Sequence, residues 1–215
     1  MKSFFRTQLT IGLLLLMLIS MTGCGNQLSK QEIARANEAF AHTVVTGNHA
    51  EASEISCFFT CYYDDPREID LWKFLYNCPL QVRLTYGDEQ EFFDWLDATD
   101  GYLEGVTWQS PEEYFVPVWR YTKDSVSALL TKYAGITADD LNSWGNALYM
   151  EKYDAFYNCS SDVRTGRFEC VGGEKDGTVI RFWSATDQDG MREVLTVEKA
   201  DETYFIRSFL IEEAK

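Results

Sequence analysis

The chain is predicted to be a single α+β domain in which N-terminal helices pack on a C-terminal antiparallel four-stranded meander. Capping signals followed by apolar residues at helical spacing recur between residues 29 and 135. From about residue 167 the apolar period changes to two, and short Gly- and Asp-rich connections separate the segments with that period. Helices followed by a run of strands are typical of α+β domains.

The first 23 residues are expected to be cut off before Cys24 and not to be part of the fold. Lys2 and Arg6 precede an apolar run from Ile11 to Ile19, and small residues follow it, which is the layout of a secretory signal. The apolar run is well short of the roughly 20 residues that a helix needs to span the hydrocarbon core. We therefore expect a signal peptide (1–23), a short tether (24–28) and one extracytoplasmic domain (29–215).

Two cap signals open the domain. Ser29-Lys30-Gln31-Glu32 has the spacing of a capping box, and Ile33, Phe40 and Val44 then recur on one helical face, which predicts a helix that ends at Gly47. Asn48-His49-Ala50-Glu51 repeats the cap signal. The apolar cluster that follows it (Ile55, Phe58 and Phe59) is predicted to be buried.

The strongest local signal is Asp65-Pro66-Arg67-Glu68, because Asp can cap, Pro fits the first helical position and Glu suits the third. Its helix should run to about Asn77, where Pro79 stops it. Alternation of Val82, Leu84 and Tyr86 with polar residues then predicts a half-buried strand from Gln81 to Tyr86.

Two more helices are expected before the sheet. Residues 88–96 form the first, with Phe92, Trp95 and Leu96 inward, and residues 97–121 are expected to be an aromatic loop. Thr122 opens the second, which runs to Gly135. A further turn starts at Thr137, and residues 148–157 fit either period. Four strands then follow at 167–171, 178–184, 191–199 and 203–212, with connections short enough for a meander.

Charge excludes one class of partner. The net charge is −15, and removal of Lys2 and Arg6 with the signal segment makes the mature chain more negative by two. Nucleic-acid binding needs clustered Lys and Arg to replace counterions, so no nucleic-acid partner is expected. An anionic bilayer would also repel the mature surface. The acidity is best explained by solubility at a cell surface.

The cysteines leave alternatives open. Disulfides are permitted outside the cytoplasm, and Cys159 and Cys170 flank a short segment that can turn back on itself, so these two are a possible pair. Zinc is disfavoured because the spacings of Cys57, Cys61 and Cys78 match no common ligand pattern. If Cys159 and Cys170 pair, one thiol among Cys57, Cys61 and Cys78 remains free or pairs elsewhere, so the pairing of these three stays open. Buried, chemically inert cysteines are the default, and no metal or other cofactor is expected.

Met21-Thr22-Gly23-Cys24 resembles the lipobox of bacterial lipoproteins, although leucine is commonest at the position of Met21. This resemblance implies that export and lipoprotein-processing enzymes attach diacylglycerol to the Cys24 thiol, cut before it and acylate the new amino group, for example with palmitate. Two or three acyl chains anchor a protein stably. The expected location is the extracytoplasmic face of the cell membrane, and the bilayer is the first expected partner.

Four further segments look like a set of uncharacterised lipoproteins from anaerobic, clostridial-type Gram-positive bacteria. The likeness covers most of the mature chain and implies location and lineage, but no chemistry. The segments are Ile55-Ser56-Cys57-Phe58-Phe59-Thr60, Glu68-Ile69-Asp70-Leu71, Lys132-Tyr133-Ala134-Gly135-Ile136 and Tyr153-Asp154-Ala155-Phe156-Tyr157.

A search for catalytic motifs disfavours most enzyme classes. The sequence contains no Gly-x-Ser-x-Gly elbow, Walker loop, His-Glu-x-x-His or dinucleotide glycine fingerprint. Its two histidines, His42 and His49, lie in a segment predicted to be surface. Carboxylate pairs such as Asp64 with Asp65, or Asp139 with Asp140, are able in principle to hydrolyse a glycoside. Such pairs also arise by chance among 34 acidic residues, so a non-enzymatic role is the favoured interpretation and an enzyme stays the alternative.

The best candidate for a ligand groove is the aromatic stretch that contains Trp108, Tyr114, Phe115, Trp119 and Tyr121, because flat rings with polar tips suit sugars and peptides. Core packing of the same rings is the favoured alternative. Two hypotheses follow from the sequence. The first is a non-catalytic surface module that binds a protein or wall component, or a soluble ligand. The second is a small cell-wall hydrolase that uses paired carboxylates.

Overall fold

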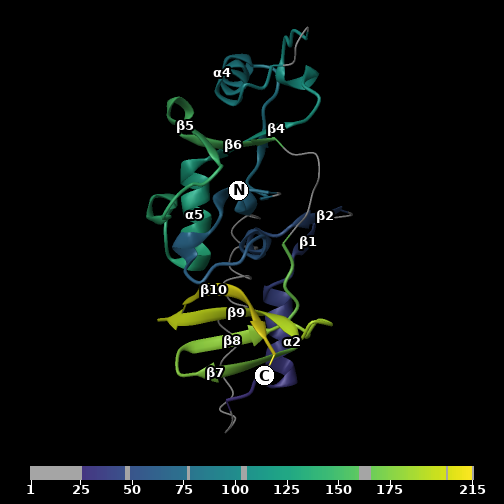
Figure 1. The fold of residues 1–215 in the computed structure, drawn as a ribbon, viewed down its shortest axis with the longest axis vertical. Helices are drawn as coiled ribbons and strands as arrows, with labels where there is room; N and C mark the ends of the chain where they lie inside the picture. Colours follow the sequence, from purple (N-terminus) through teal and green to yellow (C-terminus); the bar gives the residue numbers. More distant parts are fainter. Residues whose placement is uncertain are drawn as a thin grey trace.

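The computed structural model describes residues 26–46, 49–76, 78–102, 106–159, 166–201 and 203–214. The molecule is elongated, with the C-terminal sheet at one end, α4 (Glu89–Thr99) at the other and α5 (Lys123–Ala134) between them (Figure 1). Mixed helices and antiparallel sheets confirm the predicted α+β class. The signal segment and Cys24 lie outside the described residues.

The C-terminal sheet is the predicted four-stranded antiparallel meander, in the order β10-β9-β8-β7. Its strands are β7 (Gly172–Asp176), β8 (Val179–Trp183), β9 (Met191–Ala200) and β10 (Thr203–Glu213). The last three agree with the predicted strands, whereas the prediction of a strand at 167–171 is wrong. That segment is irregular, and the residues expected to be a loop form β7.

Two glycines explain this shift. Cβ atoms built on Gly172 and Gly173 would lie 2.3 Å from Trp183 Nε1 and 2.4 Å from Leu28 Cδ1, so neighbouring side chains occupy the space over this strand. Gly177 has a φ of +59° and closes the two-residue turn to β8, in which Asp176 pairs with Val179. Gly172 and Gly173 therefore mark a strand whose faces are closely covered by neighbouring side chains, and only Gly177 marks a turn.

The first helix, α2 (Lys30–Ala39), begins with the predicted capping box: the Ser29 hydroxyl accepts from the Glu32 N–H at 3.3 Å. It ends at Phe40, so the predicted extension to Gly47 is wrong. The β-branched run at 43–46 instead forms β1 (Thr43–Thr46), which pairs with β2 (His49–Ala52). The described residues after the predicted cap signal, from His49 to Ala52, therefore form a strand and not a helix.

Short 3₁₀ turns follow. The apolar cluster that contains Phe58 lies on η2 (Glu54–Phe59) and is buried, as predicted. Asp65 caps η3 (Pro66–Glu68), but the expected long helix is wrong, because the chain becomes extended at Ile69 and Asp70 then caps a second short helix, α3 (Leu71–Phe74). Ile69, at which the predicted helix is interrupted, is buried in the large cluster.

A second antiparallel sheet, in the order β3-β4-β6-β5, lies nearer the other end of the molecule. The predicted strand at 81–86 shrinks to β3 (Val82–Arg83), and only Leu84 of its three apolar positions is buried. Residues expected to be loop form η4 (Pro111–Glu113) and β4 (Val118–Thr122). The ambiguous 148–157 segment holds β5 (Leu148–Met150), η6 (Glu151–Tyr153) and the start of β6 (Ala155–Cys159).

The central helix agrees with its prediction. Thr122 caps α5 and Gly135 ends it in the left-handed region, with a φ of +73°. The predicted inward face is buried: Val126, Leu129, Leu130 and Tyr133. A capping box from Thr137 then opens η5 (Ala138–Asp140). Phe205 of β10 lies against Gly135, so the helix end contacts the C-terminal sheet.

The second sheet separates two hydrophobic clusters. Along β6, Phe156 belongs to the large cluster that joins the helices to the C-terminal sheet, whereas Ala155 and Tyr157 belong to a small cluster under α4. The cysteines of the proposed Cys159–Cys170 pair follow this division. Cys159 packs on the small cluster, Cys170 lies in the large one, and both thiols are free, so the structure does not join them.

Candidate functional site

The five aromatics of the predicted groove divide into two groups. Trp119 and Tyr121 lie on β4 and pack on the large cluster. Tyr121 is fully buried and its hydroxyl donates to the Leu75 carbonyl at 2.8 Å. For these two residues the core-packing alternative is correct, because β4 is a central strand and turns both rings toward the large cluster.

The other three rings contact one another. The ring centroid of Tyr114 lies 5.2 Å from the ring centroid of Trp108 and 4.5 Å from that of Phe115. On its other side Tyr114 meets Phe92 and Trp95 of α4, at 5.6 and 5.4 Å. Tyr114 is buried, whereas Phe115 is 63% exposed. A rigid base therefore supports an aromatic ring that faces solvent.

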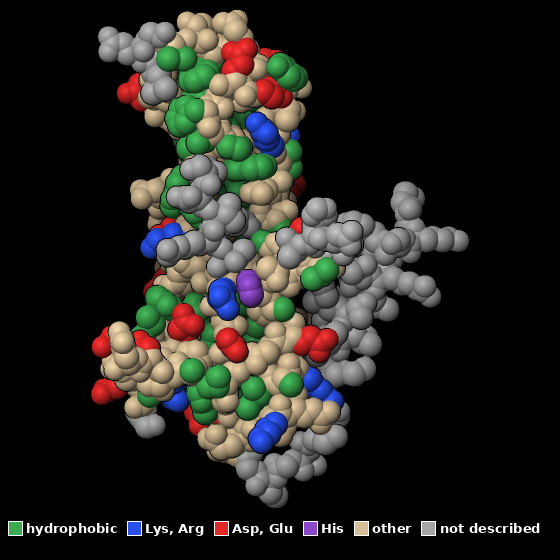
Figure 2. Space-filling model, turned by 90° about the vertical axis from the view of Figure 1, so that its right-hand side faces the viewer, with side chains coloured by type: hydrophobic (Ala, Val, Ile, Leu, Met, Phe, Trp, Pro, Cys, Tyr) green, Lys and Arg blue, Asp and Glu red, His purple; other side chains and the backbone are tan. Residues whose placement is uncertain are grey.

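Two exposed tyrosines flank these rings. Tyr86 is 73% exposed, and its backbone N–H donates to Glu112 Oε1 on η4 at 2.5 Å. Tyr102 is exposed next to Gly101, whose carbonyl accepts from the Tyr114 hydroxyl at 3.3 Å. We call Tyr86, Tyr102, Trp108, Tyr114 and Phe115 the aromatic patch. Hydrophobic side chains are visible on the same upper part of the molecule in Figure 2.

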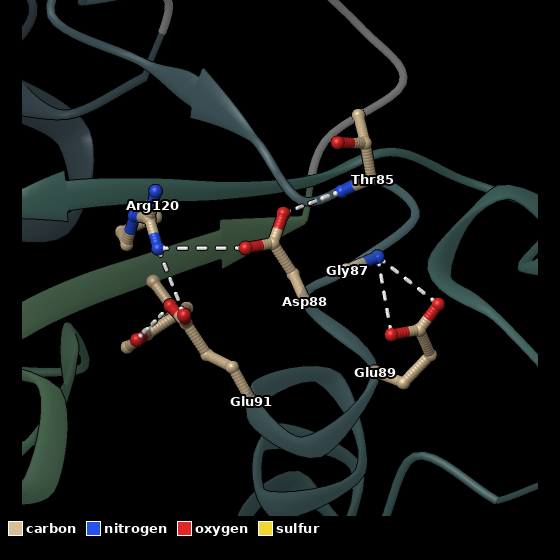
Figure 3. A network of polar contacts seen from close by, with 7 residues as sticks. Thr85, Gly87, Asp88, Glu89, Glu91 and Arg120 are labelled. Atoms are coloured by element: carbon tan, nitrogen blue, oxygen red, sulfur yellow. Dashed lines mark hydrogen bonds and ion pairs between the residues drawn. The ribbon is translucent and has the colours of Figure 1, made fainter.

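A buried polar network holds α4 in place beside the patch. Arg120 of β4 reaches both carboxylates at the start of α4, with Nη1 2.8 Å from Glu91 Oε2 and 3.8 Å from Asp88 Oδ1 (Figure 3). The Tyr157 hydroxyl donates to Glu91 Oε1. Burial, and then this bond to Glu91, raise the pKa of Tyr157. The phenol therefore stays protonated and acts as a fixed donor.

The start of α4 is itself rigid. Asp88 Oδ2 accepts from the Thr85 N–H at 2.9 Å, and Glu89 accepts from the Gly87 N–H at 3.0 and 3.1 Å (Figure 3). These bonds fix the turn that carries Tyr86. The exposed tyrosine therefore projects from an ordered turn.

Three polar atoms in or next to the aromatic patch lack hydrogen-bond partners within the described part of the chain. They are Trp108 Nε1, Ser110 Oγ and Glu112 Oε2, and all three are buried. Buried polar groups are nearly always hydrogen-bonded, so this concentration within five residues is unusual.

The two predicted carboxylate pairs lie away from the aromatic patch, and each contributes at least one residue to a separate hollow. Asp64, Asp65 and Asp140 line an open hollow of about 440 Å³ together with Arg67 and Arg207. Hydrogen bonds from Arg67 lower the pKa of Asp65 to about 2, and bonds from Thr137 lower the pKa of Asp140. Asp139 does not line the hollow; its carboxylate pairs with Lys123 Nζ at 2.6 Å.

Sequence reasoning missed two members of the patch. Tyr86 was predicted to face the core on a strand, and Tyr102 was not singled out. The turn signal at Gly87-Asp88 could have indicated that Tyr86 lies outside the strand, because Gly87 has a φ of +101°. No local pattern marks Tyr102.

Comparisons with known proteins add no assignment: no protein-family model, curated protein or solved structure matches the chain. Across the described ranges, no group of three or more His, Cys, Asp or Glu residues is arranged to hold a metal ion. The helices in the same ranges include none with the length and apolar character needed to cross a bilayer. The resemblance to clostridial-type lipoproteins stays a prediction.

Proposed function

We propose that the chain is an extracytoplasmic lipoprotein, anchored to the membrane through Cys24, whose aromatic patch binds a protein or wall component without catalysing a reaction. The observation that carries the binding role is the exposed ring of Phe115 on the buried ring of Tyr114, 4.5 Å away between centroids. Large exposed apolar side chains that are held rigidly are typical of recognition surfaces.

The chemistry around the patch suits a ligand with hydroxyl or cationic groups. The Tyr102 hydroxyl bonds to the Asp97 carboxylate, and Glu112 and Glu113 follow Pro111 on η4. Carboxylates accept hydrogen bonds from sugar hydroxyls, and aromatic faces stack on sugars or attract cations.

Binding is tested with the full-length chain purified in mild detergent. It is mixed with an insoluble cell-wall preparation, and the bound fraction is measured by co-sedimentation. Phe115→Ala should lower the apparent affinity by about tenfold, because truncating a central aromatic anchor commonly costs about 1–2 kcal/mol. Ile211→Ala, an exposed apolar change on β10, is the matched control and should bind as wild type.

The same Phe115→Ala comparison is made by chemical crosslinking in intact cells, with mass spectrometry of captured material. Enrichment of one protein, lost in Phe115→Ala and retained in Ile211→Ala, would identify a protein partner in place of a wall polymer. Equal binding by both variants in both assays would contradict the binding role of the patch. Cys24→Ala tests the anchor separately, since it should release the chain from the membrane fraction.

A small hydrolase is the second candidate, because three of the four predicted carboxylates meet in the hollow beside Arg67 and Arg207. A general acid needs a raised carboxyl pKa near neutral pH. The pKa values of Asp65 and Asp140 shift in the opposite direction. Both groups also cap 3₁₀ turns, so their geometry is explained without catalysis. Release of soluble sugar from wall preparations, lost in Asp64→Asn, would favour the hydrolase.

A further inference from the structure

The side chains of Cys57 and Cys78 lie in hydrogen-bonding contact inside the large cluster, and in this structure both thiols are free. Cys57 is on η2, and Cys78 follows the short helix α3, in which Leu71 and Phe74 are buried. Both cysteines are at most 1% exposed. No sequence pattern joined these two residues, since the spacing of Cys57, Cys61 and Cys78 left their pairing open.

The packing around the pair holds both backbones in place. Phe58, next to Cys57, meets Phe74 of α3 edge-on with ring centroids 5.0 Å apart. The Cys78 N–H donates to the Leu75 carbonyl, which also accepts from Tyr121. The segments that carry Cys57 and Cys78 are therefore held together by ring packing as well as by the contact between the two thiols.

Cys61 is differently placed. It packs at the edge of the large cluster, bonds to the Asp70 backbone and the Thr60 side chain, and is only partly buried. Although Cys61 is just four residues from Cys57, the structure therefore distinguishes the two as partners for Cys78. This difference supplies an internal control.

We propose that Cys57 and Cys78 form a structural disulfide when the chain folds in an oxidising compartment. The oxidant is a disulfide of the exchange-partner class, such as oxidised glutathione or an oxidoreductase. One cysteine thiolate attacks the partner disulfide, one partner thiol leaves, and the second cysteine displaces the other partner thiol. One disulfide forms in the protein, one is reduced to two thiols in the partner, and the two cysteine protons end on those thiols.

The timing of the reaction follows from burial. Desolvation, and then contact with Cys78, raise the pKa of Cys57, so the nucleophilic thiolate is disfavoured once the core has closed. The bond therefore forms during folding, before water leaves the cluster. Once formed, it ties both ends of the 57–78 segment to the core, including the turn from Asp64 to Arg67 that lines the hollow.

The test uses the full-length chain in mild detergent, reduced in denaturant and refolded with or without a mixture of reduced and oxidised glutathione. Free thiols are alkylated, and linked peptides are identified by mass spectrometry. Tryptic cleavage places Cys78 in residues 74–83 and both Cys57 and Cys61 in residues 36–67. Chymotrypsin, which cuts after Phe58 and Phe59, separates Cys57 from Cys61.

We expect a Cys57–Cys78 link after refolding with glutathione, in wild type and in Cys61→Ala. The linked protein should unfold roughly 6 to 12 °C higher than the reduced protein, because a loop of this length restricts the unfolded chain. The double variant Cys57→Ala/Cys78→Ala should show no effect of oxidant on its unfolding temperature. Alkylation of both thiols after oxidative refolding, or a link from Cys78 to Cys61, would overturn the proposal. These results do not depend on whether the aromatic patch binds a ligand.

Discussion

Arg120→Met is expected to destabilise the protein well beyond the loss of an ordinary surface ion pair. The Glu91 side chain is only 8% exposed and the Arg120 side chain is 28% exposed. Removing one partner of a buried ion pair leaves an uncompensated charge and typically costs about 3–5 kcal/mol. Because Tyr157 still donates to Glu91 and some water reaches Arg120, we expect a loss of about 2–3 kcal/mol in the free energy of unfolding.

Arg181→Met is the matched control. Arg181 bonds both oxygens of Glu212 at 2.7 Å, but its side chain is 35% exposed, so its removal should cost about 1 kcal/mol or less. Both variants are measured by urea unfolding of the full-length chain, followed by tryptophan fluorescence. Adding Glu91→Gln to Arg120→Met should restore part of the stability, since a neutral side chain is less costly to bury. Equal losses in the two arginine variants, or no recovery with Glu91→Gln, would refute the reasoning.

Two further outcomes are expected. The Asp65 carboxyl should titrate near pH 2 by carbon NMR in wild type and at a higher pH in Arg67→Met, although still below its ordinary value of 3.8, because the backbone N–H of residue 67 still donates to it. Since the folded pKa is the lower one, the stability that Asp65 contributes is present above about pH 4 and lost as the pH falls towards 2; an unchanged titration in Arg67→Met would contradict this. Gly166→Ala should cost about 1–3 kcal/mol in urea unfolding, because its Cβ would lie 2.5 Å from the backbone carbon of Phe59. A wild-type midpoint would show that this close approach is absent.

Local sequence signals predicted correctly those elements for which several signals lie close together in the chain and agree. The Thr122 cap, the apolar face of α5 and the left-handed Gly135 are all encoded within one stretch of chain, and the structure confirms them. The period of two in the last three strands is equally local. By contrast, Asp65 capped a turn as predicted, but the helix stopped after three residues, and the next residue, Ile69, is extended and buried.

The candidate site was only partly predictable. Its stretch of chain was identified from the density of aromatic residues, yet rings a few residues apart were assigned to different environments. β4 turns Tyr121 into the core, whereas Phe115 follows a 3₁₀ turn and remains in solvent. Sequence spacing carries no information on this choice, because it depends on which cluster lies on each side of the strand.

The sequence by itself determined the acidic charge, the α+β class and the positions of several caps, since these depend on composition or on residues a few positions apart. The signal segment stays a prediction from the same kind of local pattern. Only the tertiary structure decided that Cys57 meets Cys78, that the C-terminal sheet begins at Gly172 and that Glu91 is buried against Arg120 and Tyr157. Each of these pairings joins segments distant in sequence. Their formation depends on how two hydrophobic clusters close around a shared sheet, which no local pattern contains.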